Sequence, residues 1–146
     1  MSDVSKGPYT VSTDVSRLHL DVIHGYLTNS YWSPGVPRDI VERAIKGSLC
    51  FGVYEGKRQV GFARVVTDYA TYGYLADVFI LDELQGKGLG TWLMEVIMAH
   101  PNLQGLRRFG LVTQDAHALY EKVGFQPLAN PDRHMEIVRP DIYRKK

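Results

Sequence analysis

The sequence has no apolar run long enough to cross a membrane and only one cysteine among its 146 residues. A transmembrane helix needs roughly 18 or more consecutive apolar residues, and no stretch here approaches that length. The opening segment, MSDVSKGPYT, also lacks the apolar core of a secretory signal. A lone Cys50 excludes an intramolecular disulfide framework and is compatible with a reducing compartment. We therefore expect a cytoplasmic protein that makes no contact with a membrane.

The chain also has almost no net charge. Its 17 lysines and arginines offset 16 aspartates and glutamates, which leaves a formal charge of +1 at pH 7. A chain so close to neutrality has no bulk attraction for nucleic acid. We expect neither a nucleic-acid partner nor a metal site. The length and a hydrophobic content of 45% suit one domain with a sizeable core, and we expect it to span residues 1–146.

Glycine, by contrast, is concentrated in one place, within residues 78–92, VFILDELQGKGLGTW. An apolar, strand-like run leads to Gly86, Gly88 and Gly90, and an amphipathic helical pattern follows. Glycines let the backbone adopt positive φ angles and approach a phosphate closely. The free N–H groups at the start of a helix bind anions. A tight connection with no ligand would use the same residues.

Two well-known phosphate motifs fail on this stretch. A P-loop needs Ser or Thr after its lysine, but Gly88 follows Lys87. A dinucleotide-binding GxGxxG needs a glycine three residues after Gly88, where Thr91 stands. A nucleotide-binding protein is therefore disfavoured.

The pattern of apolar residues and turn formers predicts a mixed α+β domain of the α/β layered type. Short connections between successive strands indicate an antiparallel meander, and the glycine stretch lies in one crossover. We expect a mixed, mostly antiparallel sheet of about seven strands with helices on both faces. The expected strands are residues 9–13, 49–54, 59–67, 72–81, 107–113, 125–128 and 134–138. The expected helices are residues 14–29, 37–46, 89–100 and 116–123.

Two local motifs in this order resemble those of the GCN5-related N-acetyltransferases, the GNAT superfamily. Gln85-x-x-Gly88-x-Gly90 resembles the loop that binds the pyrophosphate of acyl-CoA in that superfamily. A second motif, AHALYEKVGF at residues 116–125, resembles the A-x-x-L-Y-x-K-x-G-F signature near the C-terminus of its members. The resemblance implies the acyl-CoA N-acyltransferase fold and acetyl-CoA as co-substrate.

The resemblance also assigns residues to the cofactor. The pantetheine arm is expected along the strand before the glycine loop, in a split between that strand and the next one. Thr113 stands where many members carry Asn, which weakens or replaces one cofactor contact. The implied cofactor-binding residues are Val78, Phe79, Ile80, Gln85, Gly86, Lys87, Gly88, Leu89, Gly90, Thr91, Thr113 and Ala116.

Two residues are the implied catalytic groups. Tyr120, the tyrosine of the Leu-Tyr pair, would protonate the departing thiolate, because a phenol with a pKa of about 10 keeps its proton at neutral pH. Packing at a helix–sheet junction is the structural alternative for this tyrosine. Asp77 would accept a proton from the acceptor amine, because the Glu that polyamine-type members carry is replaced here by Ala76. The alternative for Asp77 is to support a strand bulge or to hold an amine without deprotonating it.

The acceptor is expected across the sheet from the CoA, near His24, Tyr31, Trp32, Asp68 and Tyr74. The two adjacent aromatics would wall a site for a compact amine or, alternatively, cover the core as a lid. Asp68 is also a natural turn residue. We expect transfer of acetyl from acetyl-CoA to an amine of a small molecule. A protein amine and a non-catalytic acyl-CoA sensor are the alternatives, and the resemblance makes a homodimer through the final strand a candidate.

Overall fold

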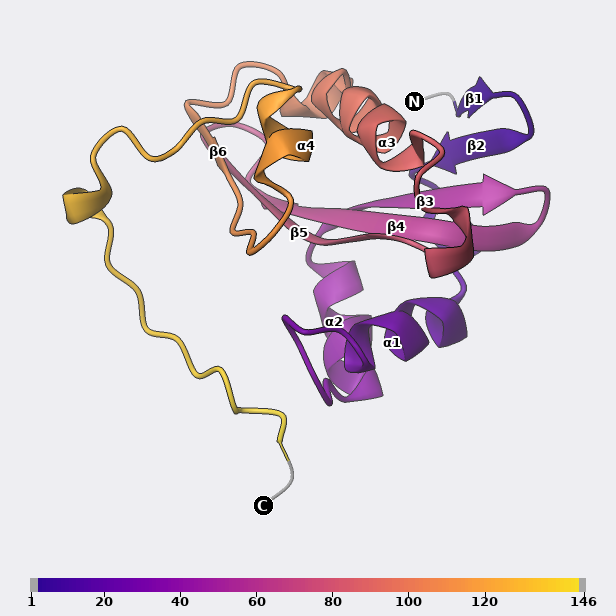
Figure 1. Cartoon of the computed structure of the whole chain (residues 1–146), viewed down its shortest axis with the longest axis horizontal. Coiled ribbons are helices and arrows are strands. Elements are labelled where there is room, and N and C mark those ends of the chain that lie inside the picture. Colours follow the sequence, from indigo (N-terminus) through magenta and orange to yellow (C-terminus); the bar gives the residue numbers. More distant parts are fainter. Residues whose placement is uncertain (1–2, 145–146) are drawn as a thin grey trace.

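A six-stranded sheet forms the centre of the molecule in the computed structural model, which describes residues 3–144 (Figure 1). The strands follow one another across the sheet in chain order. The last pair is parallel and the others are antiparallel, so the sheet is mixed and mostly antiparallel, as predicted. The strands are β1 (Val4–Lys6), β2 (Tyr9–Ser12), β3 (Leu49–Glu55), β4 (Arg58–Thr67), β5 (Tyr72–Ile80) and β6 (Arg108–Gly110).

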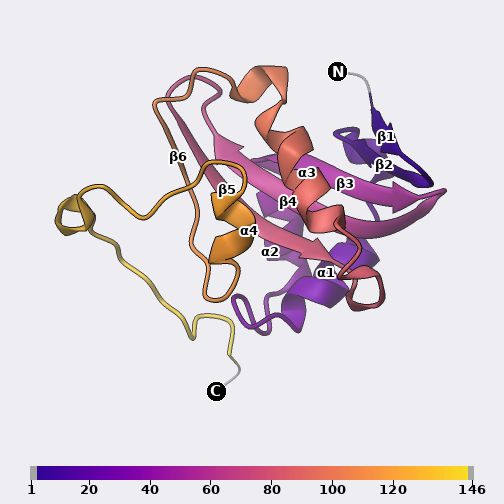
Figure 2. The same ribbon diagram turned by 45° about the horizontal axis from the view of Figure 1, so that its top comes forward.

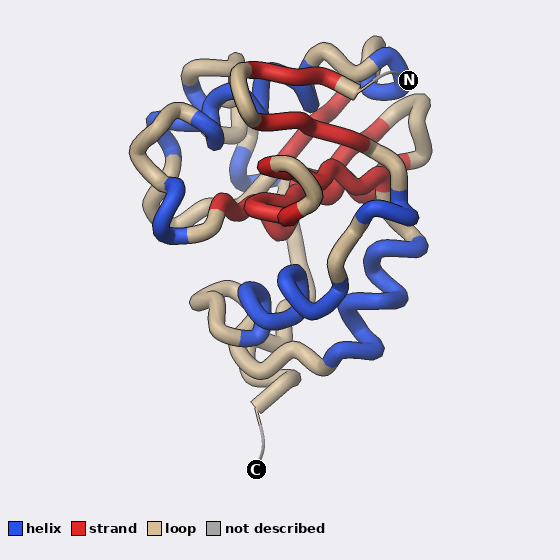
Figure 3. The backbone as a smooth tube through the Cα atoms, turned by 90° about the vertical axis from the view of Figure 1, so that its right-hand side faces the viewer, coloured by secondary structure: helices blue, strands red, loops and turns tan. Residues whose placement is uncertain are grey.

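Helices cover both faces of the sheet, again as predicted. Helices α1 (Leu20–Thr28) and α2 (Arg38–Lys46) lie on one face, and α3 (Leu89–Met98) and α4 (His117–Glu121) lie on the other (Figures 1 and 3). Four short 3-10 turns complete the regular structure, at Val15–Arg17, Asp82–Leu84, Pro101–Leu103 and Pro131–Arg133.

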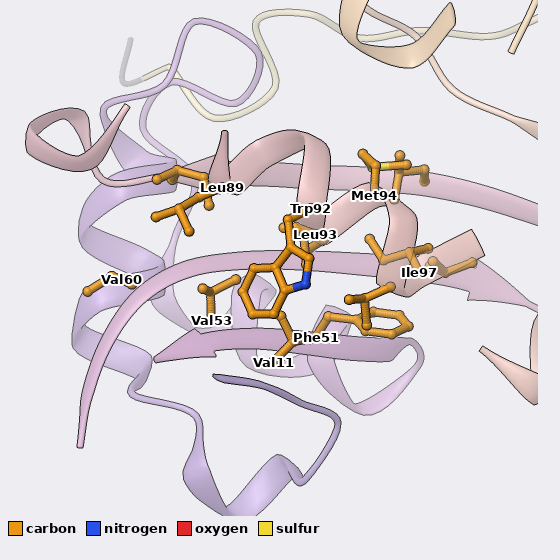
Figure 4. Packing of buried hydrophobic residues seen from close by; sticks show 14 of the residues in the cluster. Val11, Phe51, Val53, Val60, Leu89, Trp92, Leu93, Met94 and Ile97 are labelled. Carbon is orange, nitrogen blue, oxygen red and sulfur yellow. The ribbon is translucent and has the colours of Figure 1, made fainter. Parts of the chain in front are cut away.

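The larger core lies between α3 and the sheet. Leu89, Leu93, Val96 and Ile97 recur at helical spacing and are all buried, which confirms the predicted inward face of α3. Figure 4 shows this face packed against side chains of the strands, with the Trp92 ring among them. This packing fixes the axis of α3, and with it the direction in which its N-terminal amides point.

A second, smaller core lies under α1 and α2. Ile23 and Leu27 from α1 and Val41 from α2 pack against Phe62 and Phe79 of the sheet. Cys50 belongs to this cluster and is 2% exposed. Burial raises the pKa of its thiol to about 11, so the uncharged thiol serves as a small hydrophobic side chain here.

The first predicted helix, residues 14–29, is interrupted. Asp14 caps only a 3-10 turn, with its carboxylate accepting the Ser16 N–H at 3.0 Å. The backbone N–H of His19 then donates to the Oε1 atom of Gln59 at 2.7 Å, and α1 begins one residue later at Leu20. Gln59 is fully buried and comes from β4. A side chain distant in sequence therefore supplies the partner that a continuous helix would have supplied.

The C-terminal region differs most from the prediction. Residues 125–128 and 134–138 form no strand, and the strand expected at residues 107–113 is reduced to Arg108–Gly110. The sheet has six strands instead of about seven, because β1 was not predicted and the last two expected strands are not formed. The tail runs away from the body before its end returns towards α2 (Figures 1 and 2). Met135 and Ile137, within the second of these expected strands, are 97% and 85% exposed.

Candidate active site

The main cleft opens where β5 and β6 separate. The two strands pair only from Tyr72 to Tyr74, opposite Arg108 to Gly110, so the rest of β5 has no neighbour on that side. The cleft has a volume of about 1410 Å³ and is bordered by β5, the glycine loop, α4 and the loop between α1 and α2. This size exceeds a typical pocket for a drug-sized ligand, and it suits an extended cofactor together with a second substrate.

A bulge distorts β5 beside this cleft. Phe62 pairs with Phe79, but Arg64 pairs with Ala76, so β5 carries one more residue than β4 between these pairs. Asp77 lies in the bulge with a φ angle of +55°. Such an angle is uncommon outside glycine, although the short polar side chain of Asp tolerates it. The bulge turns both Asp77 and its backbone towards the cleft lining.

The glycine loop connects the end of β5 to the N-terminus of α3. Gly86 and Gly88 both have φ angles of +81°, and Gly88 is the N-cap of the helix without any side-chain cap. A Cβ atom at either position would meet nothing within 4 Å. The left-handed backbone, and not internal crowding, therefore requires glycine at these two positions. The first amides of α3 face an open space, which is the geometry of an anion site.

Gln85 holds this loop to the sheet. Its amide nitrogen donates to the carbonyl of Ile80 at 3.0 Å and to the Oδ1 atom of Asp82 at 3.1 Å. The Tyr26 hydroxyl donates to the same Asp82 oxygen at 3.0 Å. Burial, followed by that carboxylate, raises the pKa of Tyr26. Gln85 thus shapes the loop from beneath, and the amides of the loop are left to meet a ligand.

Tyr120 stands on the opposite wall, in the five-residue helix α4. Leu119 faces Gly90 of α3, where an added Cβ would come within 3.8 Å of it, so the Leu-Tyr pair brings α4 onto the glycine loop. Phe125 packs edge-on to Tyr120, with ring centroids 6.1 Å apart. Burial raises the pKa of Tyr120, with smaller contributions from Tyr31 and Asp115. The phenol therefore keeps its proton at neutral pH.

Thr113 and Ala116 form the turn that leads into α4. The Thr113 hydroxyl oxygen accepts the backbone N–H of Ala116 at 3.1 Å. The threonine thus closes the turn itself, and its hydroxyl hydrogen is still available as one donor. The amide of Ala116 is already engaged, so its contribution to the cleft is the small side chain and the carbonyl.

Tyr31 and Trp32 lie in the loop between α1 and α2 and reach both walls of the cleft. The Trp32 indole N–H donates to the Oδ1 atom of Asp77 at 2.9 Å. The Tyr31 hydroxyl accepts the backbone N–H of Gln114 at 3.4 Å. The two side chains are 51% (Tyr31) and 42% (Trp32) exposed, so they wall the cleft and do not cover the core.

Arg64 of β4 joins this group, and sequence analysis did not single it out. Its Nε atom lies 2.6 Å from the Oδ2 atom of Asp77, and its Nη1 atom donates to the Ser48 hydroxyl at 3.2 Å. The side chains are 20% (Arg64) and 13% (Asp77) exposed. The available signal was an arginine within the otherwise apolar run VGFARVV, where a charge requires a partner.

The structure brings most of the predicted site residues together and leaves three outside the cleft lining. Lys87 does not line the cleft, His24 bonds through Nε2 to the carbonyl of Val36 at 3.0 Å, and Asp68 closes the β4–β5 turn. Hydrogen bonds from Thr71, first from its side chain and then from its backbone, lower the pKa of Asp68.

Tyr74 does line the cleft, and burial raises its pKa. Glu136, Val138 and Tyr143 also line it, from a tail for which a strand had been predicted.

Two kinds of feature are absent from residues 3–144. Within this range, no group of three or more His, Cys, Asp or Glu side chains is placed to hold a metal ion. In the same range, no helix has both the length and the apolar character that crossing a membrane requires.

Comparison with known proteins agrees with the geometry. A family model described as an acetyltransferase (GNAT) domain matches residues 46–127, more than half of the chain. A Gibberella zeae protein, provisionally named as an acetyltransferase, is 36% identical over 141 residues, covering 81% of this chain and 78% of its own length.

Solved structures show the same relationship. A crystal structure from Xanthomonas campestris pv. campestris, assigned provisionally as a GNAT-family acetyltransferase, is 49% identical with a TM-score of 0.91, covering 94% of this chain and 97% of its own. A Clostridium acetobutylicum structure, described as an acetyltransferase with acetyl-CoA, shares the fold at 16% identity and a TM-score of 0.63, covering 89% of this chain and 94% of its own. The chain therefore belongs to the GNAT family of acetyltransferases.

Proposed function

We propose that this protein, as one domain spanning residues 1–146 and located in the cytoplasm, transfers acetyl from acetyl-CoA to the primary amine of a small molecule. One observation carries the proposal: the glycine loop and the N-terminus of α3 face Tyr120 across the gap between β5 and β6. An anion site and a proton donor thus border the same cleft. The acetyl-CoA named for the Clostridium acetobutylicum structure, which has the same fold, supports the choice of co-substrate.

The cofactor would bind along the wall formed by β5 and α3. The amides of Leu89, Gly90 and Thr91, at the positive end of the α3 dipole, suit a pyrophosphate. Beyond Tyr74, β5 has no β6 partner. The backbone groups from Val78 to Ile80 that β4 and Gln85 leave unpaired would pair with the amides of a pantetheine arm, because buried backbone groups require hydrogen-bond partners.

The chemistry requires one attack and one proton donation. The neutral amine attacks the thioester carbonyl and forms a C–N bond, and the negative charge that develops on the carbonyl oxygen is stabilised by a backbone N–H of β5. The nitrogen, positively charged after the attack, loses one proton to solvent. The C–S bond then breaks, Tyr120 donates its proton to the departing thiolate, and the resulting phenolate regains a proton from water. A phenol that stays protonated at neutral pH, as burial of Tyr120 ensures, suits this step.

A thiol-release assay tests the proposal against its main alternative, a sensor that binds acetyl-CoA without turnover. Acetyl-CoA would be offered with benzylamine, putrescine, glycine, glucosamine and a lysine-containing peptide. We expect amine-dependent release of CoA with at least one small amine. Tight binding of acetyl-CoA without thiol release from any amine would favour the sensor, and turnover of the peptide alone would favour a protein acceptor.

We also propose that the protein forms a homodimer through its C-terminal tail. The outer edge of β6 has no strand beside it within residues 3–144, and the tail exposes Leu128, Met135 and Ile137 to solvent. An open sheet edge and an unpaired extended segment are complementary in a second copy of the chain. Light scattering should give a dimer for the full chain and a monomer after removal of residues 126–146. A monomeric full chain would contradict this arrangement.

A further inference from the structure

We propose that Asp77 is a positioning residue that clamps the aromatic loop, residues 30–33, to the bulge of β5, and that the acceptor's proton leaves to solvent instead of to this carboxylate. The proposal refines the acceptor side of the function proposed above and rests on it. It replaces the role of general base that the resemblance implied for Asp77.

Both oxygens of the Asp77 carboxylate already accept hydrogen bonds. Oδ1 accepts the indole N–H of Trp32 at 2.9 Å, and Oδ2 accepts from Nε of Arg64 at 2.6 Å. Hydrogen bonds to an ionised carboxylate are stronger than bonds between neutral groups. Transfer of a proton onto either oxygen would place it against a donor or remove the charge that holds Arg64. Both oxygens are therefore already engaged by Trp32 and Arg64.

The position of Arg64 is itself constrained. Its backbone pairs across the sheet with Ala76, the residue before Asp77, and its Nη1 atom is held by the Ser48 hydroxyl at 3.2 Å. The guanidinium therefore approaches the carboxylate from a fixed direction. A half-buried charged pair that lost one partner would leave the other charge uncompensated, which is unfavourable.

The titratable side chains near Asp77 come from several elements. Besides Arg64 from β4, the titratable groups around Asp77 are Cys50 from β3 and Tyr74 from β5, with Glu136 of the tail near Tyr74. Burial raises the pKa of the Cys50 thiol to about 11 and also raises that of Tyr74. The Cys50 thiol and the Tyr74 phenol are therefore both uncharged at neutral pH.

The clamp acts on a loop that spans the cleft. At its base, the Ser30 hydroxyl donates to the Leu27 carbonyl at 2.7 Å and accepts the Ser33 N–H at 3.2 Å. The Tyr31 and Trp32 rings meet edge to face, 5.1 Å apart, and the Tyr31 hydroxyl reaches the segment before α4. Trp32 is thus the point at which this loop is tied to β5. Releasing it would displace the aromatic wall that faces an acceptor.

The first test requires no turnover. Asp77→Asn retains size and tolerates a positive φ but loses the charge, whereas Trp32→Phe removes the N–H donor and keeps an aromatic ring. We expect each variant to increase amide hydrogen exchange of residues 30–33 by about tenfold, and the double variant to add little beyond either. The affinity for acetyl-CoA, measured by calorimetry, should stay within about twofold because neither variant changes a residue proposed to hold the cofactor.

A matched control exists on the surface. Asp21 also pairs with an arginine at 2.6 Å, but its side chain is 88% exposed and lies outside the cleft. Asp21→Asn should leave the exchange of residues 30–33 unchanged. Unchanged exchange in Asp77→Asn as well would overturn the clamp, whatever the activity of that variant.

The second test separates positioning from proton transfer, with the fastest amine of the panel above as acceptor. We expect Asp77→Asn and Trp32→Phe to raise the acceptor KM by about tenfold with little change in kcat, and to keep the pH profile of the wild type. A fall in kcat of about 10²-fold or more in Asp77→Asn, with loss of an ionisation and with Trp32→Phe unaffected, would make Asp77 the base. If no amine is turned over while the exchange result holds, the proposed function fails and the clamp stands.

Discussion

The two walls of the cleft are packed very differently. The wall of β5 and α3 rests on the larger core, where Phe51, Leu93 and Ile97 are fully buried. The wall of β6, α4 and the tail follows Leu103, and within residues 104–144 no residue is buried. The same cleft therefore has one side set in the core and another that lies on the surface.

The difference matters for what each wall has to do. An anion site depends on amides held in a fixed direction, and α3 obtains that from its buried face. The opposite wall has a three-residue strand and a five-residue helix, both too short to be stable without tertiary contacts. We expect such a wall to open more easily, which suits the side that carries the proposed proton donor, Tyr120.

The largest expected effect contrasts the two walls directly. Phe51→Ala should lower the free energy of unfolding by about 3–5 kcal/mol, because it empties a fully buried site beneath α3. Phe125→Ala should lower it by less than half as much, since that ring is only partly buried against Phe109. Urea denaturation measures both values. Equal losses would mean that the two walls are equally well packed.

The next effect concerns the chemistry of the wall formed by β6, α4 and the tail. Tyr120→Phe should lower kcat by about 10²-fold or more with little change in acetyl-CoA affinity, because only the donated proton is lost. Steady-state kinetics and calorimetry measure the two quantities. Tyr69→Phe, at a turn where the side chain is 50% exposed, is the control and should have wild-type kcat. An unchanged kcat in Tyr120→Phe would remove this residue from the mechanism.

A smaller effect concerns the cofactor loop on the packed wall. Gly88→Val forces a β-branched residue into a left-handed conformation, at about 1–2 kcal/mol, and should weaken CoA binding about tenfold. Gly56→Val introduces similar strain in the β3–β4 hairpin, where φ is +62° and space is also open. Both variants should melt at lower temperatures, but only the first should bind CoA more weakly. Wild-type CoA affinity in Gly88→Val would mean that the loop does not hold the pyrophosphate.

The smallest effect is a pH dependence of the folding stability, and it arises at His100. His100 is 3% exposed, and burial lowers its pKa below the value of about 6.5 expected in the unfolded chain. As pH falls through 6.5, the unfolded state takes up the proton first, so stability decreases until the folded-state pKa is passed. His100→Asn can still accept the Asn102 N–H that Nδ1 accepts now, but it cannot titrate. Its melting temperature should therefore fall less than that of the wild type between pH 7.5 and pH 5.

Local rules predicted the packed wall well. The boundaries of α2, β3, β4, β5 and α3 agree with the prediction to within two residues, and the inward face of α3 is confirmed. Those elements follow strong periodicity and clear turn residues, so neighbours in the sequence determine them. The prediction for the C-terminal tail was wrong because alternating apolar residues form a strand only when they pair with another strand. Within residues 3–144, no such pairing occurs.

The features of the site also divide into those set by local sequence and those set by tertiary contacts. By itself, the sequence determined the glycine loop and the Leu-Tyr pair, because their spacing encodes local backbone conformation and one helix turn. Only the tertiary structure decided the environment of Asp77, which unites Trp32 and Arg64 from two other elements. Those partners are 45 and 13 residues away in the chain, and their meeting depends on the bulge in β5 and on how the loop crosses the cleft. No local pattern carries that information, because the residues next to Asp77 in the sequence do not determine which distant side chains contact its carboxylate.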